Sequence, residues 1–169
     1  VSSSTGGWVG DNSGLGFGVF MASKDVDGDG RYEVLASAYN LDTDIDTDVG
    51  GVRFIPGHID GDQTSWPEEG RAWSGTLADG KMGYSLDFAG DWDGDGVEDI
   101  VTGAPYYSEN TGAAFIFSSE MEDGSVDGAV WSLISPEPDV FFGMAVLGVG
   151  DLDEDGLDDV LISARKANG

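Results

Sequence analysis

Three short segments of the chain place carboxylate side chains at one repeated spacing. They read DVDGDGRYE from Asp25, DWDGDGVED from Asp91 and DLDEDGLDD from Asp151. Each has carboxylates at its first, third, fifth and ninth positions and a Gly at the sixth that permits a sharp turn, while the seventh residue offers only its backbone carbonyl. A cage of hard oxygens suits Ca²⁺, which accepts roughly six to eight oxygen ligands, whereas Mg²⁺ keeps its waters. The spacing therefore predicts calcium sites.

An EF-hand and a metal-free hairpin turn are the alternatives to such a site. An EF-hand needs a bidentate Glu at its twelfth position, and this chain has Ala36, Thr102 and Ile162 there, so the EF-hand is excluded. Asp-Gly segments also form ordinary hairpin turns without any metal. Three copies, each with four carboxylates so close together, would repel strongly in a folded protein without a cation, and this favours metal binding.

The acidic segments lie between runs that are typical of β-strands. A Gly-rich apolar run precedes each segment, and a β-prone run (VLASA, DIVTGAP or VLISA) follows it. Further strands are indicated by GGVRFIP from Gly50, by GAAFIFS from Gly112 and by a recurring Trp. The recurring residues are Trp8, Trp73 and Trp131. A repeat of about 60 residues with four short strands predicts an all-β fold made of β-propeller blades, each of four antiparallel strands, or a comparable repeated sheet.

The composition excludes several classes of partner. The chain has 169 residues, and 33 acidic against 7 basic side chains give it a formal charge of −26. That charge argues against nucleic acid and anionic membrane surfaces. No membrane insertion is expected, because the longest mainly apolar stretch, Val140 to Val149, is far shorter than a membrane span. With no Cys, the chain has neither a disulfide framework nor a zinc–thiolate site.

One repeat carries a specific family resemblance. The segment MGYSLDFAGDWDGDGVEDIVTGAP, residues 82–105, resembles an FG-GAP repeat of the integrin α-chain β-propeller. The other two repeats are looser versions, and Glu154 replaces the usual Gly at the fourth position of the third loop, where it disfavours the turn. The resemblance implies that each acidic loop joins the first two strands of a blade and binds Ca²⁺, giving three sites.

The implied ligands in the first loop are Asp25, Asp27, Asp29, the carbonyl of Arg31, and Glu33. In the second loop they are Asp91, Asp93, Asp95, the carbonyl of Val97, and Asp99. In the third loop they are Asp151, Asp153, Asp155, the carbonyl of Leu157, and Asp159.

The chain, residues 1–169, is expected to form a single repeat domain of about 2.5 to 3 blades, which is an incomplete ring because propellers have about four to eight. The expected units are residues 1–15, a fourth strand of a preceding or closing blade, then 16–80, 82–140 and the partial unit 142–169. Open flanks would expose apolar blade faces. We therefore expect an oligomer or a fragment of a larger propeller.

The strand order puts a second group of residues on the face opposite the acidic loops. These candidates for partner binding are Tyr39, Asp42, Asp44, Asp46, Asp48, Tyr106 and Tyr107. In an extended backbone the four Asp side chains would share one side and could hold a fourth cation. The alternative is a hydrated acidic loop, because the bending Gly is missing. The Tyr side chains would either contact a partner or cap the blade.

The function expected from these features is a calcium-binding, extracellular β-propeller module for adhesion, protein–protein interaction or assembly. Its partner would be a protein or carbohydrate ligand, or further copies of itself. Weak calcium sites fill only outside cells, which supports an extracellular or cell-surface location. An architectural subunit of a surface layer or filament is one alternative. A propeller-type polysaccharide lyase or hydrolase is another, but no acid/base pair can be named, so the chain is expected not to be an enzyme.

Overall fold

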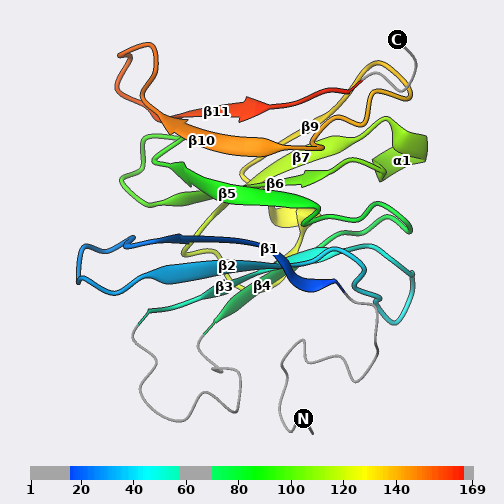
Figure 1. Cartoon of the computed structure of the whole chain (residues 1–169), viewed down its shortest axis with the longest axis horizontal. Helices are drawn as coiled ribbons and strands as arrows, with labels where there is room; N and C mark the ends of the chain where they lie inside the picture. The colour runs from blue at the N-terminus through cyan, green and yellow to red at the C-terminus, as the bar shows by residue number, and fades with distance from the viewer. Residues whose placement is uncertain (1–15, 58–69, 166–169) are drawn as a thin grey trace, which may run out of the picture.

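A computed structural model describes residues 16–57 and 70–165, and these residues form three antiparallel sheets (Figure 1). The predicted unit 1–15 and Trp8 lie outside the described residues. The predicted all-β fold is confirmed, because the only helical elements in the described parts are two short turns. They are α1 (Tyr107–Asn110) and the 3₁₀ turn η1 (Val126–Gly128).

The first two sheets each contain four antiparallel strands in sequence order, and a fifth, two-residue strand extends the first sheet. The first contains β1 (Phe17–Lys24), β2 (Glu33–Ala38), β3 (Gly51–Ile55) and β4 (Arg71–Ser74). The second contains β5 (Ser85–Gly90), β6 (Asp99–Ala104), β7 (Ala113–Ser118) and β9 (Trp131–Ile134). The third pairs β10 (Val146–Gly150) with β11 (Asp159–Ile162). Trp73 and Trp131 lie in fourth strands, as predicted.

One short strand was not predicted. The two-residue β8 (Gly124–Ser125), which follows β7 of the second sheet, pairs in parallel with β4 of the first sheet. The amide of Ala72 on β4 also donates to Asp123 Oδ1 at 2.8 Å. A Gly-Ser pair carries no β signal of its own. The contact nevertheless covers part of the outer edge of the first sheet, where unpaired strands are prone to association.

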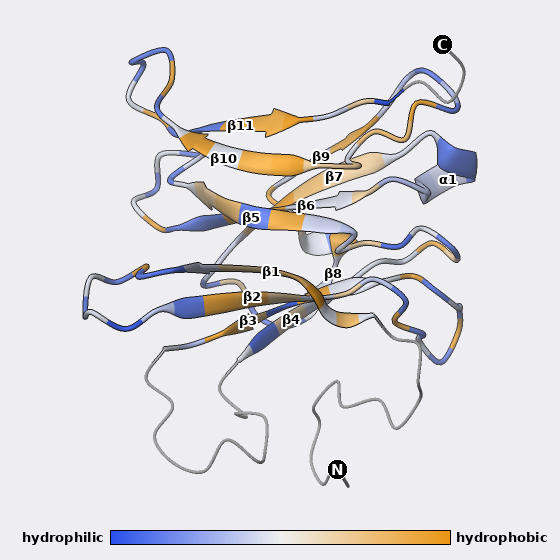
Figure 2. Ribbon diagram, viewed as in Figure 1, coloured by the Kyte–Doolittle hydropathy of each residue, from blue (hydrophilic) through white to orange (hydrophobic). Residues whose placement is uncertain are grey.

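Hydrophobic residues lie mainly in the strands (Figure 2), and the buried ones form two clusters that join neighbouring sheets. The main core contains Leu35, Ile100 and Trp73, all 0% exposed, and the Trp73 ring stacks on Phe117 of the second sheet at a centroid distance of 5.4 Å. A smaller core joins the second sheet to the third and includes Val101. Because each sheet buries a face against its neighbour, the sheets stack as blades do.

Glycine permits the closest approach between neighbouring sheets. Gly112 bridges Phe142 in parallel, and a Cβ at Gly112 would collide with the Phe142 backbone. Gly50 makes the same bridge to Met82 one repeat earlier. Both glycines have positive φ values, 76° at Gly50 and 85° at Gly112, which also favours residues without Cβ. The repeated bridge keeps successive blades in the same relative position.

The loops gather at two opposite ends of the stack. The acidic loops β1–β2, β5–β6 and β10–β11 lie at the left of Figure 1, and the β2–β3 loop, α1 and the links between the sheets lie at the right. The three sheets do not close into a ring. Among the described residues, no helix has the length and apolar character needed to cross a membrane.

Candidate metal sites

The three acidic loops, residues 25–33, 91–99 and 151–159, repeat one set of hydrogen bonds from backbone amides to carboxylates. The amide at the sixth position donates to the first side chain, the fifth amide to the third side chain, and the seventh amide to the fifth side chain. For the second loop these bonds are Gly96 to Asp91 (3.1 Å), Asp95 to Asp93 (3.1 Å) and Val97 to Asp95 (2.8 Å). The first and third loops make the same bonds at 2.7 to 3.2 Å. Each carboxylate is thus oriented by its own loop.

The turn depends on two positions with left-handed backbone. At the fourth and sixth positions φ is 74° and 87° in the first loop, and 81° and 85° in the second, where all four residues are Gly. In the third loop Glu154 adopts φ 63° at the fourth position. The third loop therefore makes the turn with a residue that has a Cβ, at a cost of about 1 to 2 kcal/mol.

Carboxylate oxygens converge within each loop. The groups whose oxygens all lie within 4.8 Å of one another are Asp25, Asp27 and Asp29; Asp91, Asp93 and Asp95; and Asp151, Asp153 and Asp159. Of the implied carboxylates, Glu33, Asp99 and Asp155 lie outside these tightest groups. Arg31, Val97 and Leu157 are held by their amides, which orients the seventh residue, and the role of their carbonyls stays a prediction.

Several carboxylate oxygens are buried without a hydrogen-bond donor in the described structure. They are Asp25 Oδ1, Asp91 Oδ1 and Asp99 Oδ1. A buried carboxylate oxygen without a donor is costly, and carboxylates in such a position pair with a cation or coordinate a metal. The acceptor-only chemistry of these oxygens and the convergence of carboxylates in the same loops fit a divalent cation that prefers oxygen ligands.

The ninth position differs among the loops. In each loop its carboxylate accepts the amide of the second residue, at 2.8 Å for Glu33, 3.1 Å for Asp99 and 2.9 Å for Asp159. The second oxygen of Glu33 accepts the amide of Gly57 at 2.9 Å. The second oxygen of Asp99 is one of the unpartnered oxygens. Burial, and then the charge of Asp93, raise the pKa of Asp99 to about 6.

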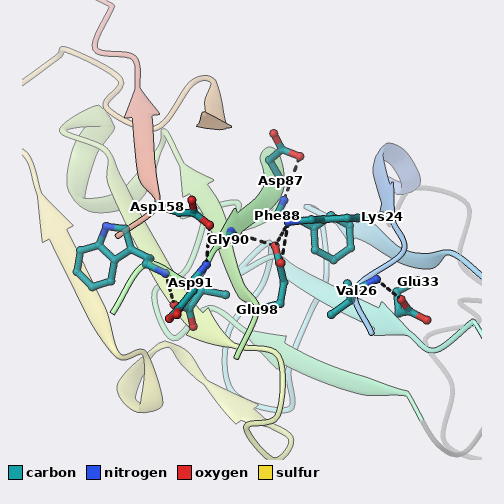
Figure 3. A network of polar contacts seen from close by, with 11 residues as sticks. Lys24, Val26, Glu33, Asp87, Phe88, Gly90, Asp91, Glu98 and Asp158 are labelled. Atoms are coloured by element: carbon teal, nitrogen blue, oxygen red, sulfur yellow. Dashed lines mark hydrogen bonds and ion pairs between the residues drawn. The ribbon is translucent and has the colours of Figure 1, made fainter. Parts of the chain in front are cut away.

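The eighth position links one loop to the preceding one, and this role was missed in the sequence (Figure 3). Asp158 of the third loop accepts the amide of Asp91 at 2.9 Å. Glu98 of the second loop accepts the amide of Gly90 at 3.0 Å and pairs with Lys24 at 2.7 Å. The available signal is an acidic residue directly before the ninth position in two of the three loops.

The opposite end carries a row of aromatic rings. Phe20, Tyr39, Tyr84, Tyr106 and Phe141 follow one another at centroid distances of 5.4 to 6.0 Å. This row crosses all three sheets, since its members come from β1, the β2–β3 loop and the links before β5, after β6 and before β10. Three of these rings, Phe20, Tyr84 and Phe141, were not predicted as candidates.

Lys81 lies beside this row. Its Nζ is 6.0 Å from the ring centroids of both Tyr39 and Tyr106, and it donates to Asn40 Oδ1 at 3.0 Å. Lys81 and Tyr106 also line a cavity of about 630 Å³. The remaining lining residues are Leu77, Ala78, Asp79, Ser108, Glu109 and Asn110.

The other residues predicted at this end are Tyr107 and the four Asp residues of the segment Asp42–Asp48, and they lie in different surroundings. Tyr107 packs on the main core and contacts Phe115 at 5.8 Å, so it caps the blade, which was the second of the two predicted roles. The segment Asp42–Asp48 is not extended: Thr43 and Asp46 close a turn, and Asp42 Oδ1 accepts the amide of Asp48 at 2.8 Å. Within the described residues, these four Asp side chains form no converging carboxylate group.

Four-stranded antiparallel sheets, stacked face to face and each with an Asp-rich loop between its first two strands, define this protein as an assembly of β-propeller blades. The FG-GAP repeat model matches residues 82–117. Human integrin alpha-D is 31% identical over 93% of the chain, and Xenopus laevis integrin alpha-5 is 31% identical over 88%. Human integrin alpha-7 is 34% identical over 54%. The predicted family resemblance is confirmed: the chain contains an FG-GAP repeat and is similar to integrin α chains over most of its own length.

The match is partial with respect to the relatives. The chain spans 14% of the length of integrin alpha-D and of integrin alpha-5, and 8% of integrin alpha-7. The similarity therefore concerns a small part of each relative.

Proposed function

We propose that the three acidic loops bind Ca²⁺ and that the bound ions stabilise the blades. The observation that carries this proposal is a pair of buried, unpartnered oxygens, one on Asp91 and one on Asp99, while the second oxygen of each accepts a backbone amide of the same loop. Bound Ca²⁺ would supply positive charge to oxygens that have no donor. The proposed ligands are those implied by the family resemblance, including the three backbone carbonyls.

The three loops differ in how well their residues suit a bound Ca²⁺ ion. The second loop has Gly at both left-handed positions and two unpartnered oxygens, which supports the tightest site. In the first loop both oxygens of Glu33 accept amides, from Val26 and Gly57, so Glu33 would have to share one with the ion. In the third loop Asp151 is exposed and Asp159 is half-buried, whereas the residues at these positions of the other two loops are half-buried and buried, and the third loop also has the left-handed Glu154. It is proposed as the weakest site.

Calorimetric titration of the full chain with Ca²⁺ tests this assignment. We expect three sites in the native chain and two after Asp93→Asn with Asp95→Asn. Asn keeps the side-chain oxygen that accepts the amide, so the turn is preserved while two charges are lost. The matched control, Asp44→Asn with Asp46→Asn, removes the same charge at the opposite end and should leave three sites. A native chain that gives no binding signal for Ca²⁺ would overturn the assignment.

The whole module is proposed to act outside the cell in adhesion, protein–protein interaction or assembly, and not as an enzyme. The similarity to integrin α chains supports this role. The proposed contact surface is the aromatic row with the neighbouring Asp42, Asp44, Asp46 and Asp48, and its partner is a protein or carbohydrate ligand. Tyr107 does not belong to that surface, because its ring packs on the core. The partner would meet an aromatic surface with Lys81 and surrounding carboxylates.

A cell-attachment assay on surfaces coated with the chain tests the adhesive role. Attachment should require Ca²⁺ and should fall when Tyr39 and Tyr106 are both replaced by Ala. The attachment of a Phe20→Leu variant shows how much the Phe20 end of the aromatic row contributes compared with Tyr39 and Tyr106. Attachment that is unchanged in the double variant would contradict this surface.

Self-assembly is a second candidate, and the outer face of the third sheet favours it. Leu147 on β10 and Leu161 on β11 lie opposite each other and are 51% and 54% exposed. The counterpart of Leu161 in the second sheet, Val101, is fully buried in the core that joins the second sheet to the third. Units 16–80 and 82–140 are proposed as blades, 142–169 as a partial blade and 1–15 as the fourth strand of a preceding or closing blade. The ring would be completed by other copies or by further blades. Analytical ultracentrifugation in Ca²⁺ distinguishes a monomer from an assembly.

A further inference from the structure

The third acidic loop contacts the second directly. The amide of Asp158 donates to the carbonyl of Asp91 at 3.1 Å, and the amide of Asp91 donates back to Asp158 Oδ2 at 2.9 Å. A Cβ at Gly90 would collide with the Asp158 carboxylate. A Cβ at Gly94 would lie 2.8 Å from Leu157 Cδ2, so a second contact joins the same two loops. These contacts leave little room for one loop to move without the other.

The position of this contact connects the two proposed ion sites. Asp91 is the first residue of the second loop, and one of its oxygens is buried and unpartnered. Asp158 is adjacent to Asp159, whose carboxylate converges with Asp151 and Asp153 in the third loop. The reciprocal pair of hydrogen bonds therefore joins the backbone of a ligand residue in one loop to the neighbour of a ligand residue in the next (Figure 3).

The corresponding link between the first and second loops is of another kind. Glu98 reaches the first sheet through Lys24 Nζ, whose side chain is 46% exposed. The Glu98 side chain is only 9% exposed, but this ion pair joins two side chains and does not connect the backbone of one loop to the other. No backbone bond between the first and second loops accompanies it in the described structure. The two links thus provide a natural comparison within one molecule.

We propose that Asp158 is a positioning residue that couples cation binding at the third loop to cation binding at the second. This inference rests on the proposed calcium binding. An ion at the second loop fixes Asp91, and the bonded Asp158 then holds the third loop near its bound conformation. The third loop then loses less conformational entropy when its own ion binds. Coupling of binding is reciprocal, so each ion should tighten the other site by the same factor, on the order of 5- to 10-fold.

The test measures the Ca²⁺ affinity of the third loop by calorimetry in the full chain. The first loop is silenced throughout by Asp27→Asn with Asp29→Asn, and the second loop is either native or silenced by Asp93→Asn with Asp95→Asn. Silencing the second loop should weaken the third about 5- to 10-fold. After Asp158→Ala, silencing should change the affinity of the third loop by less than about 2-fold.

Two control variants separate positioning from charge. Asp158→Asn keeps an oxygen that accepts the Asp91 amide, so it should retain the coupling. Glu154→Gln removes one negative charge from the same loop without touching the link, and it should retain the coupling as well. A variant series in which coupling follows charge, and not the acceptor oxygen at residue 158, would overturn the proposal.

Hydrogen exchange of the Asp91 amide provides a readout that does not depend on affinity. With the second loop silenced, filling the third loop should slow this exchange in the chain with native Asp158 and with Asp158→Asn, but not with Asp158→Ala. If Asp158→Ala does not fold, exchange in the other two chains decides, and unchanged exchange overturns the proposal. Calcium binding without coupling overturns this inference alone. Absence of calcium binding at every loop overturns the proposed function with it.

Discussion

The two ends of the stacked sheets use the same acidic residue types in different ways. At the acidic-loop end, one pattern of amide-to-carboxylate bonds repeats in all three loops. At the opposite end, the Asp42–Asp48 segment closes a turn of its own and α1 contains three left-handed residues, so successive repeats do not match. A common ligand would impose a common geometry, whereas surfaces that meet different partners need not repeat. This difference supports the proposals of ion binding at the first end and of partner recognition at the second.

The largest expected effect is on stability, and it separates the two ends. Removing Ca²⁺ with EDTA should lower the melting temperature strongly, because each site filled at 100 times its dissociation constant contributes about 2.7 kcal/mol. Asp93→Asn with Asp95→Asn should reproduce part of this loss. Asp44→Asn with Asp46→Asn should leave the melting temperature in Ca²⁺ nearly unchanged. Identical melting curves in EDTA and in millimolar Ca²⁺ would break the comparison.

The next largest effect distinguishes the roles of Tyr106 and Tyr107 at the opposite end. Tyr107→Ala should destabilise the chain by about 2 to 4 kcal/mol, because the ring packs on the main core beside Phe115. Tyr106→Ala should cost about 1 kcal/mol, since it loses two ring contacts in a half-buried row. Urea unfolding of both variants in Ca²⁺ measures the difference. Equal losses would mean that both tyrosines cap the blade, leaving no free ring at residue 106.

These two tyrosines also show what a sequence can predict. The acidic loops and the strand order follow from local spacing, because the residues that form one loop are neighbours in the chain. Adjacent Tyr106 and Tyr107 look alike in the sequence and are both half-buried, yet Tyr107 packs on the main core whereas Tyr106 contacts Tyr84 and Phe141 of the aromatic row. The role of Asp158 depends on the distance between two sheets, which no local pattern encodes. The pairing of β8 with β4 was missed for the same reason.

A smaller effect depends on pH and on one carboxylate. The pKa of Asp99 is raised to about 6 in the absence of Ca²⁺, so the folded chain holds this proton over a range where the unfolded chain has released it. The Asp99 contribution to stability in EDTA should therefore decline as pH rises from about 4 through 6. In Ca²⁺ the ion requires the carboxylate, so the stabilisation by Ca²⁺ should grow over the same range.

Melting curves of the native chain and Asp99→Asn, recorded from about pH 4 to 8 in EDTA and in Ca²⁺, isolate this contribution. Asn retains the oxygen that accepts the Trp92 amide and does not titrate here. The melting temperature of the native chain relative to Asp99→Asn should fall with rising pH in EDTA and should rise with pH in Ca²⁺. A difference that is independent of pH in both would show that Asp99 is not the titrating group at the acidic-loop end.

The smallest effect lies within the acidic-loop end and concerns Glu154. Its backbone has φ 63°, at the position where the first and second loops have Gly. Glu154→Gly should relieve about 1 kcal/mol of left-handed strain in the bound loop, although the freer unfolded chain offsets part of this gain. Because the strain is greatest when the turn is fixed, the gain should appear mainly as tighter Ca²⁺ binding at the third loop, measured by calorimetry.

The reverse change, Gly94→Glu, would introduce the strain into the second loop and also meet Leu157, so it should weaken binding more than Glu154→Gly improves it. Calorimetry of both variants measures this asymmetry. If Glu154→Gly leaves the Ca²⁺ affinity of the third loop unchanged while Gly94→Glu weakens that of the second, the left-handed turn at residue 154 does not lower the affinity of the third loop. The weaker fit of the third loop must then come from the exposure of its carboxylates.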